Sequence, residues 1–95
     1  MIEITRRTDG ITITGHAGYA EPGKDIVCAA ISALTETLAA AMDKLTTDQI
    51  KSDIRAGNAV IRYGDLSEPG QLLVNSFFVG CQMIADEYPA CVRIV

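Results

Sequence analysis

The sequence predicts a two-layer α+β domain, in which two helices pack on one face of a largely antiparallel sheet. Short runs of alternating apolar and polar residues occur in pairs around glycine-containing turns, which is typical of β-hairpins. Two longer stretches carry apolar residues at steps of three and four, the spacing of one buried helix face. The resulting order is β-β-α-β-β-α-β, and the 95 residues, 1–95, form a single domain by length.

The first predicted hairpin lies at the start of the chain. Ile2 and Ile4 alternate with polar neighbours, residues 8–10 (Thr-Asp-Gly) supply turn chemistry, and residues 11–14 alternate again. Residues 15–24 contain three glycines and a proline, so we expect a loop there.

The first predicted helix runs from about Asp25 to Leu45. Asp25 is a favourable N-cap, because its side chain can accept hydrogen bonds from the first free amides of a helix. The expected buried stripe consists of Val27, Ile31, Leu34, Leu38, Ala41, Met42 and Leu45.

The second half of the chain repeats the strand-strand-helix order. Residues 50–55 and 59–63 are predicted strands around Gly57-Asn58. A second helix is expected from about Ser67 to Tyr88, with Pro69 in its first turn, followed by a strand over residues 91–95. Its expected buried stripe consists of Leu73, Phe77, Cys81, Ile84 and Tyr88.

Composition narrows the function classes. The apolar share of 48% excludes a disordered chain. The sequence contains no run of about 18 apolar residues, so no membrane span is predicted. Glu3 interrupts any signal-peptide pattern, so a cytoplasmic protein is expected. The net charge of −4 argues against nucleic-acid binding. No second helical layer is available for the other sheet face; if that face is apolar, a second copy of the chain would cover it, which predicts a homodimer.

His16 and Cys28 are the candidate chemical groups. Cys28 falls in the first turn of the predicted helix, where free amides and the helix dipole favour a thiolate. His16, the only histidine, ends the preceding strand, and a tight loop brings a strand end close to a helix start. The pair then has the form of a nucleophile and its general base, with nearby amides or the Ser32 hydroxyl as oxyanion donors.

Simpler interpretations remain open for the same residues. A lone cysteine on a helix is most often a small buried hydrophobe, and a lone histidine at a strand end is most often a surface residue. Residues 18–24 fit G-x-x-x-x-G-K, but Asp25 stands where a phosphate-binding loop needs Ser or Thr. Cys81 and Cys91 are expected in the core and form no paired ligand motif, so neither a metal nor a cofactor is predicted.

One motif connects these residues to a known family. Gly15-His16-Ala17, the loop over residues 18–24, and the run Asp-Ile-Val-Cys-Ala-Ala-Ile-Ser over residues 25–32 resemble the signature of the ribosomal-processing cysteine protease family, Prp. The resemblance implies a cysteine endopeptidase with His16 and Cys28 as its dyad, and with Asp25 and Ser32 supporting the site. It also implies a homodimer and a loop that moves on substrate binding, carrying Gly18, Tyr19 and Gly23.

The resemblance further implies the substrate. Family members remove a short N-terminal extension from a large-subunit ribosomal protein, cutting after paired aromatic residues, and phage relatives are thought to process capsid or scaffold proteins with a similar segment. The expected partner is therefore a peptide segment of a ribosomal or phage structural protein, not a nucleic acid or a membrane. The alternative is a non-catalytic ribosome-assembly adaptor, which would bind the same partner without depending on Cys28.

Overall fold

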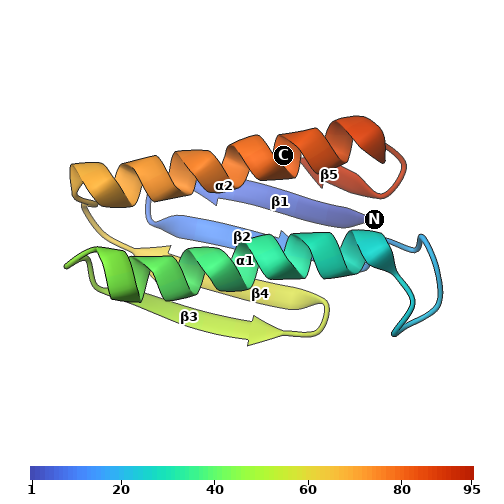
Figure 1. Ribbon diagram of the computed structural model, residues 1–95, viewed down its shortest axis with the longest axis horizontal. Coiled ribbons are helices and arrows are strands. Elements are labelled where there is room, and N and C mark those ends of the chain that lie inside the picture. Colours follow the sequence, from blue (N-terminus) through green and yellow to red (C-terminus); the bar gives the residue numbers. More distant parts are fainter.

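Five strands and two helices form two layers in the computed structural model, which describes all 95 residues. Both helices cross the same face of the sheet, roughly along the strands (Figure 1). The element order is the predicted one: β1 (Ile2–Arg7), β2 (Gly10–Thr14), α1 (Ile26–Leu45), β3 (Ile50–Arg55), β4 (Asn58–Tyr63), α2 (Glu68–Glu87) and β5 (Val92–Ile94).

The sheet has the strand order β3-β4-β2-β1-β5 and is largely antiparallel, as predicted. Arg7 pairs with Gly10 and Arg55 pairs with Asn58, so both hairpins close through two-residue turns. β5 is the parallel exception: it lies beside β1, with Ile2 opposite Val92, because α2 carries the chain back across the sheet. This final strand is shorter than the predicted range of 91–95.

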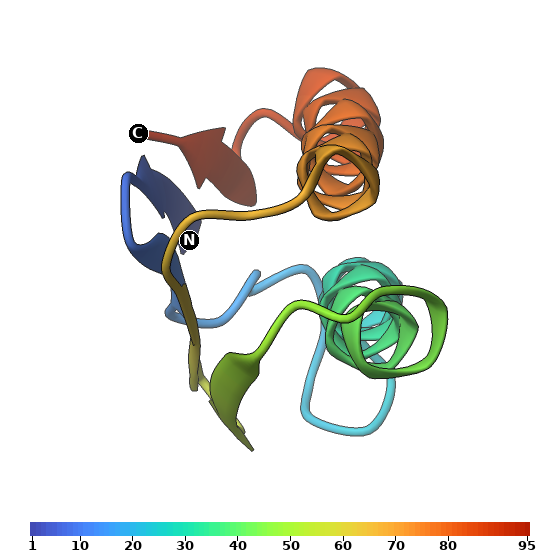
Figure 2. The ribbon, with the colours of Figure 1, turned by 90° about the vertical axis from the view of Figure 1, so that its left-hand side faces the viewer.

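The two helices lie side by side on one side of the sheet (Figure 2). Each helix buries one stripe of residues. Most of the predicted α1 stripe is correct, but Leu45, the last residue of the helix, is 70% exposed. Thr35 is buried instead; its hydroxyl is satisfied by donating to the Ile31 carbonyl at 2.8 Å. The residues that α1 buries are Val27, Ile31, Thr35, Leu38 and Met42.

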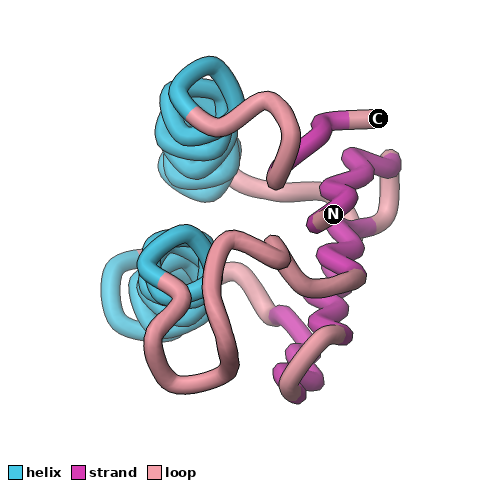
Figure 3. Tube along the Cα trace, turned by 90° about the vertical axis from the view of Figure 1, so that its right-hand side faces the viewer, coloured by secondary structure: helices cyan, strands magenta, loops and turns pink.

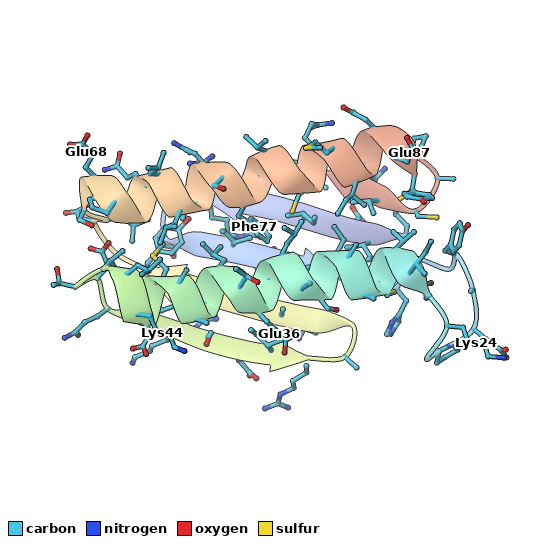
Figure 4. The ribbon with its side chains drawn as sticks, viewed as in Figure 1. Lys24, Glu36, Lys44, Glu68, Phe77 and Glu87 are labelled. Atoms are coloured by element: carbon cyan, nitrogen blue, oxygen red, sulfur yellow. The ribbon has the colours of Figure 1, made fainter.

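The predicted α2 stripe is correct at two of its five positions. Phe77 and Cys81 are buried as expected, and Phe77 lies between the two helices in Figure 4. Leu73, Ile84 and Tyr88 are only partly buried, since α2 packs against α1 as well as the sheet and its deepest contacts fall between the two. The residues that α2 buries are Gly70, Val74, Phe77, Cys81 and Ala85.

No helix covers the second face of the sheet (Figure 3), and the residues on it are polar. Strand alternation places Thr5 and Thr12, which pair with each other, opposite to the buried Ile4 and Ile11. The same face carries the cross-strand pair Lys51 and Arg62. The condition for a homodimer through this face, an apolar surface, is therefore not met.

α1 is long and apolar enough to cross a membrane when judged by length and composition alone. Polar residues interrupt the apolar sequence of this helix, so a search for an unbroken apolar run does not detect it. In the fold, its apolar stripe packs into the core shared with α2 and the sheet. A core helix of an α+β domain meets the same test of length and composition.

Candidate active site

The start of α1 positions Cys28. Asp25 is the N-cap, as predicted, and Cys28 is the third residue of the helix. One oxygen of the Asp25 carboxylate accepts hydrogen bonds from the Val27 amide at 3.0 Å and from the Cys28 amide at 2.9 Å. This double cap fixes the first turn, so the half-buried Cys28 side chain has a defined direction.

Asp25 also holds the loop that precedes the helix. Its other carboxylate oxygen accepts from the Tyr19 amide at 2.9 Å and from the Ala20 amide at 3.3 Å. The hydrogen bond from the Cys28 amide is the main cause that lowers the pKa of Asp25, and the loop amides add to it against the opposing effect of desolvation. Asp25 is therefore a carboxylate at neutral pH, and one side chain joins the loop to the helix start.

His16 lies just after β2, two residues past the end of the strand at Thr14 rather than within it as predicted. The Gly15 amide just before it donates to the Gly57 carbonyl at 2.9 Å, which joins this strand end to the β3–β4 turn. The imidazole lies directly against Gly57: a Cβ atom built on Gly57 would be 2.6 Å from His16 Nε2. His16 is otherwise exposed.

His16 and Cys28 face the same cleft, which has a volume of about 710 Å³ and is also lined by Asp25 and Ser32. The Ala17 amide, next to His16, donates to Cys28 Sγ at 3.3 Å, so the two segments are in direct contact. The His16 ring makes no hydrogen bond to Cys28 in this structure. In enzymes without bound substrate, the distance between catalytic groups is often too long for a good hydrogen bond, and it shortens when substrate binds.

Of the two kinds of oxyanion donor expected, the backbone amides near Cys28 and the Ser32 hydroxyl, two of the amides are already hydrogen-bonded. The Val27 and Cys28 amides already donate to Asp25, so these amides of the helix start are not free to hold an oxyanion in this state. The exposed Ser32 lies one helical turn after Cys28 and lines the cleft, so its hydroxyl remains a candidate donor.

The three predicted loop residues divide into two groups. Gly18 and Gly23 line the cleft. Tyr19 does not: its ring packs edge-on against Tyr88 after α2, with centroids 5.4 Å apart. Lys24 lies at the outer end of the loop in Figure 4 and pairs with Glu21 at 3.1 Å. This exposed ion pair takes up the lysine that a phosphate-binding loop would direct at its ligand.

The other two cysteines lie outside the cleft. Cys81 is fully buried in α2, and this burial raises the pKa of its thiol to about 12. Cys91 is half-buried and packs against the core. All three cysteines are free thiols, and no group of three potential metal ligands lies together.

Sequence reasoning did not identify the opposite wall of the cleft. This wall is the end of the β3–β4 hairpin, contributed by Ile54, Arg55, Ala56, Gly57, Asn58 and Ala59. It reaches His16 because β2 pairs with β4, with Thr14 opposite Asn58. The hairpin itself is visible in the sequence, but its place beside β2 is a long-range pairing that no local pattern specifies.

Comparisons with known proteins agree with this geometry. A sequence model of the family described as cysteine protease Prp matches residues 1–93. The chain is 32% identical over 100 residues to the ribosomal processing cysteine protease Prp of Staphylococcus aureus, covering 98% of this chain and 94% of that protein.

Solved structures agree as well. A crystal structure of an essential ribosomal processing protease Prp from S. aureus, in complex with a covalently linked product peptide, aligns with a TM-score of 0.87 at 29% identity. That alignment covers 98% of this chain and 94% of the other. A Streptococcus mutans protein aligns with a TM-score of 0.73 at 32% identity, over 98% of this chain and 89% of that one. The chain belongs to the Prp family of cysteine proteases.

Proposed function

We propose that this protease removes a short N-terminal extension from a large-subunit ribosomal protein, with Cys28 as nucleophile and His16 as general acid and base. The observation that carries the proposal is that both residues face one cleft beside the loop that Asp25 holds. The family is one of cysteine proteases, and Cys28 is the one cysteine that lines this cleft. The S. aureus relative is a ribosomal processing protease.

The proposed reaction is acyl transfer in two halves. The Cys28 thiolate attacks the scissile carbonyl carbon, and a C–S bond forms as the carbonyl electron pair moves onto oxygen. The C–N bond then breaks, and His16 gives a proton to the departing amine. In the second half, His16 takes a proton from water and the resulting hydroxide attacks the thioester. The C–S bond then breaks to release a carboxylic acid and the Cys28 thiolate, with His16 protonated again as at the start. The covalently linked product peptide of the S. aureus relative supports a covalent route.

The walls of the cleft support an apolar peptide segment as substrate. Ile13 of β2, Ile31 of α1 and Ile54 of β3 line it. Apart from the catalytic pair, Asp25 and Arg55 are the only side chains in its lining that carry a charge at neutral pH. Arg55 forms an exposed ion pair with Asp53 at 3.0 Å, so its charge has a partner outside the lining of the cleft. Such a cleft accommodates the aromatic side chains that the family resemblance places before the cleavage point.

We also propose a homodimer that forms through α2. Leu72, Val79 and Met83 are 63–68% exposed and share one face of the helix, at spacings of seven and four. Two copies related by a two-fold axis would cover this stripe. We expect wild type to sediment as a dimer and Val79→Glu to sediment as a monomer. If Val79→Glu is still a dimer, the interface lies on another surface. If wild type is a monomer, the proposed dimer is wrong.

We place the protein in the cytoplasm, where a ribosomal substrate is made and where free thiols stay reduced. Separation of the tagged native protein into soluble and membrane fractions tests this placement and the expected absence of a membrane partner.

The deciding experiment for the substrate is mass spectrometry of two purified precursors after incubation with the protein. One is the ribosomal protein with its N-terminal extension, and the other is a phage capsid protein with a similar segment. We expect one cut in the ribosomal precursor with wild type and none with Cys28→Ala. Cleavage of the capsid protein alone would show that the substrate is a phage structural protein and not the ribosomal protein. If neither precursor is cut, and wild type and Cys28→Ala bind one of the precursors equally well, the protein acts as an adaptor.

A further inference from the structure

Gly57, in the β3–β4 turn, supports His16 from the side opposite the helix. We infer that Gly57 is a positioning residue for the catalytic imidazole, an inference that rests on the dyad proposed above. Its carbonyl accepts from the Gly15 amide at 2.9 Å, which fixes the backbone just before His16. Its Cα faces the ring itself. One residue therefore sets both the backbone and the side chain of His16.

The absence of a side chain at residue 57 is what makes room for the ring. A Cβ atom would lie 2.6 Å from His16 Nε2 and 3.0 Å from Cε1. Ordinary van der Waals contact begins near 3.4 Å, so the ring would have to retreat by about 0.8 Å. The ring is exposed and can swing outward, so the protein can accommodate the substitution by moving His16.

The turn alone does not explain the glycine. Gly57 has φ of +75°, in the left-handed region where asparagine is also tolerated. A merely conformational requirement would therefore allow Asn at residue 57. The contact with His16 would not, because Asn carries the same Cβ atom as every other L residue. Ala and Asn thus separate backbone strain from displacement of the ring.

A displaced base slows proton transfer more than it weakens binding. Misplacement of a reacting group by about 1 Å lowers turnover by up to roughly 100-fold. We expect Gly57→Ala and Gly57→Asn to lose roughly 10- to 100-fold in kcat, with a much smaller change in KM. Ala should unfold more easily than Asn, while both lose similar activity.

The test combines peptide cleavage kinetics with NMR of the imidazole. His16 is the only histidine, so its ring protons give one assignable pair of signals. In both Gly57 variants we expect shifted ring signals and the loss in kcat. In a His16→Ala background, adding Gly57→Ala should cause no further loss, because the ring it displaces is gone.

The outcomes separate this inference from the proposed dyad. If His16→Ala keeps full activity, the dyad is wrong. If His16→Ala is inactive but Gly57→Asn retains wild-type kcat and unshifted ring signals, the dyad stands and the positioning role fails. If Asn restores the activity that Ala loses, Gly57 serves the turn alone and the positioning role also fails.

Discussion

Thiol alkylation should separate the three cysteines of the folded protein. Iodoacetamide reacts with the ionised thiol, and only where it can reach the sulfur. Cys28 is partly exposed in the cleft, whereas Cys81 is completely buried in α2. We therefore expect the first adduct on Cys28 and none on Cys81.

The size of the effect follows from the burial of Cys81. Desolvation raises the pKa of its thiol from 9.0 to about 12. At pH 8, about one Cys81 side chain in ten thousand is then ionised, against about one in ten in the unfolded chain. Folding thus lowers the reactive fraction about a thousandfold, before the lack of access is counted.

The assay is a time course of alkylation at pH 8 with peptide mapping by mass spectrometry, in buffer and in urea. Cys28→Ala is the matched control: its first adduct should move to the half-buried Cys91 and leave Cys81 unmodified. Alkylation of Cys81 in buffer at a rate within tenfold of its rate in urea would refute the argument from burial.

Three further predictions concern the cap, the core and pH. Asp25→Asn should speed amide hydrogen exchange at Tyr19 and Ala20, because the carboxylate oxygen that both amides donate to is lost; unchanged exchange would mean that the loop is held by other contacts. In the wild type, the pKa of Asp25 is lower in the folded protein than its unfolded value near 3.8. The hydrogen bonds from the loop amides to its carboxylate are therefore fully formed above pH 3.8 and are lost as the pH falls through the lower folded pKa. Amide exchange at Tyr19 and Ala20, measured at decreasing pH, checks this direction. Phe77→Ala should cost about 3–5 kcal/mol in urea unfolding, whereas Leu45→Ala should cost under about 0.5 kcal/mol; equal costs would contradict the observed burial.

Local patterns predicted much of this fold. Alternation and turn residues located both hairpins, and the predicted cap Asp25 and the predicted start near Ser67 placed both helix starts within one residue. The errors occur where tertiary packing decides. Leu45 continues the apolar spacing but is exposed at the last position of the helix. Thr35 fits the helical spacing between Ile31 and Leu38 but is polar, and it can be buried because its hydroxyl donates to the Ile31 carbonyl within the helix.

The site was predictable on one side only. His16 and Cys28 flank a short loop, so sequence distance alone limits their separation in space. The β3–β4 wall depends on the pairing of β2 with β4, and the occupied Cys28 amide depends on the rotamer of Asp25. Neither is encoded in the spacing of the motif. The polar outer face of the sheet was readable from alternation, but only once the strand register was known.

The most direct test of the proposed chemistry is the initial rate of precursor cleavage by four proteins: wild type, Cys28→Ala, His16→Ala and Cys91→Ala. We expect wild type and Cys91→Ala to cleave at similar rates, because Cys91 packs against the core rather than lining the cleft. Cys28→Ala and His16→Ala should each lose at least about 1000-fold. Cleavage by Cys28→Ala at the wild-type rate would contradict the account.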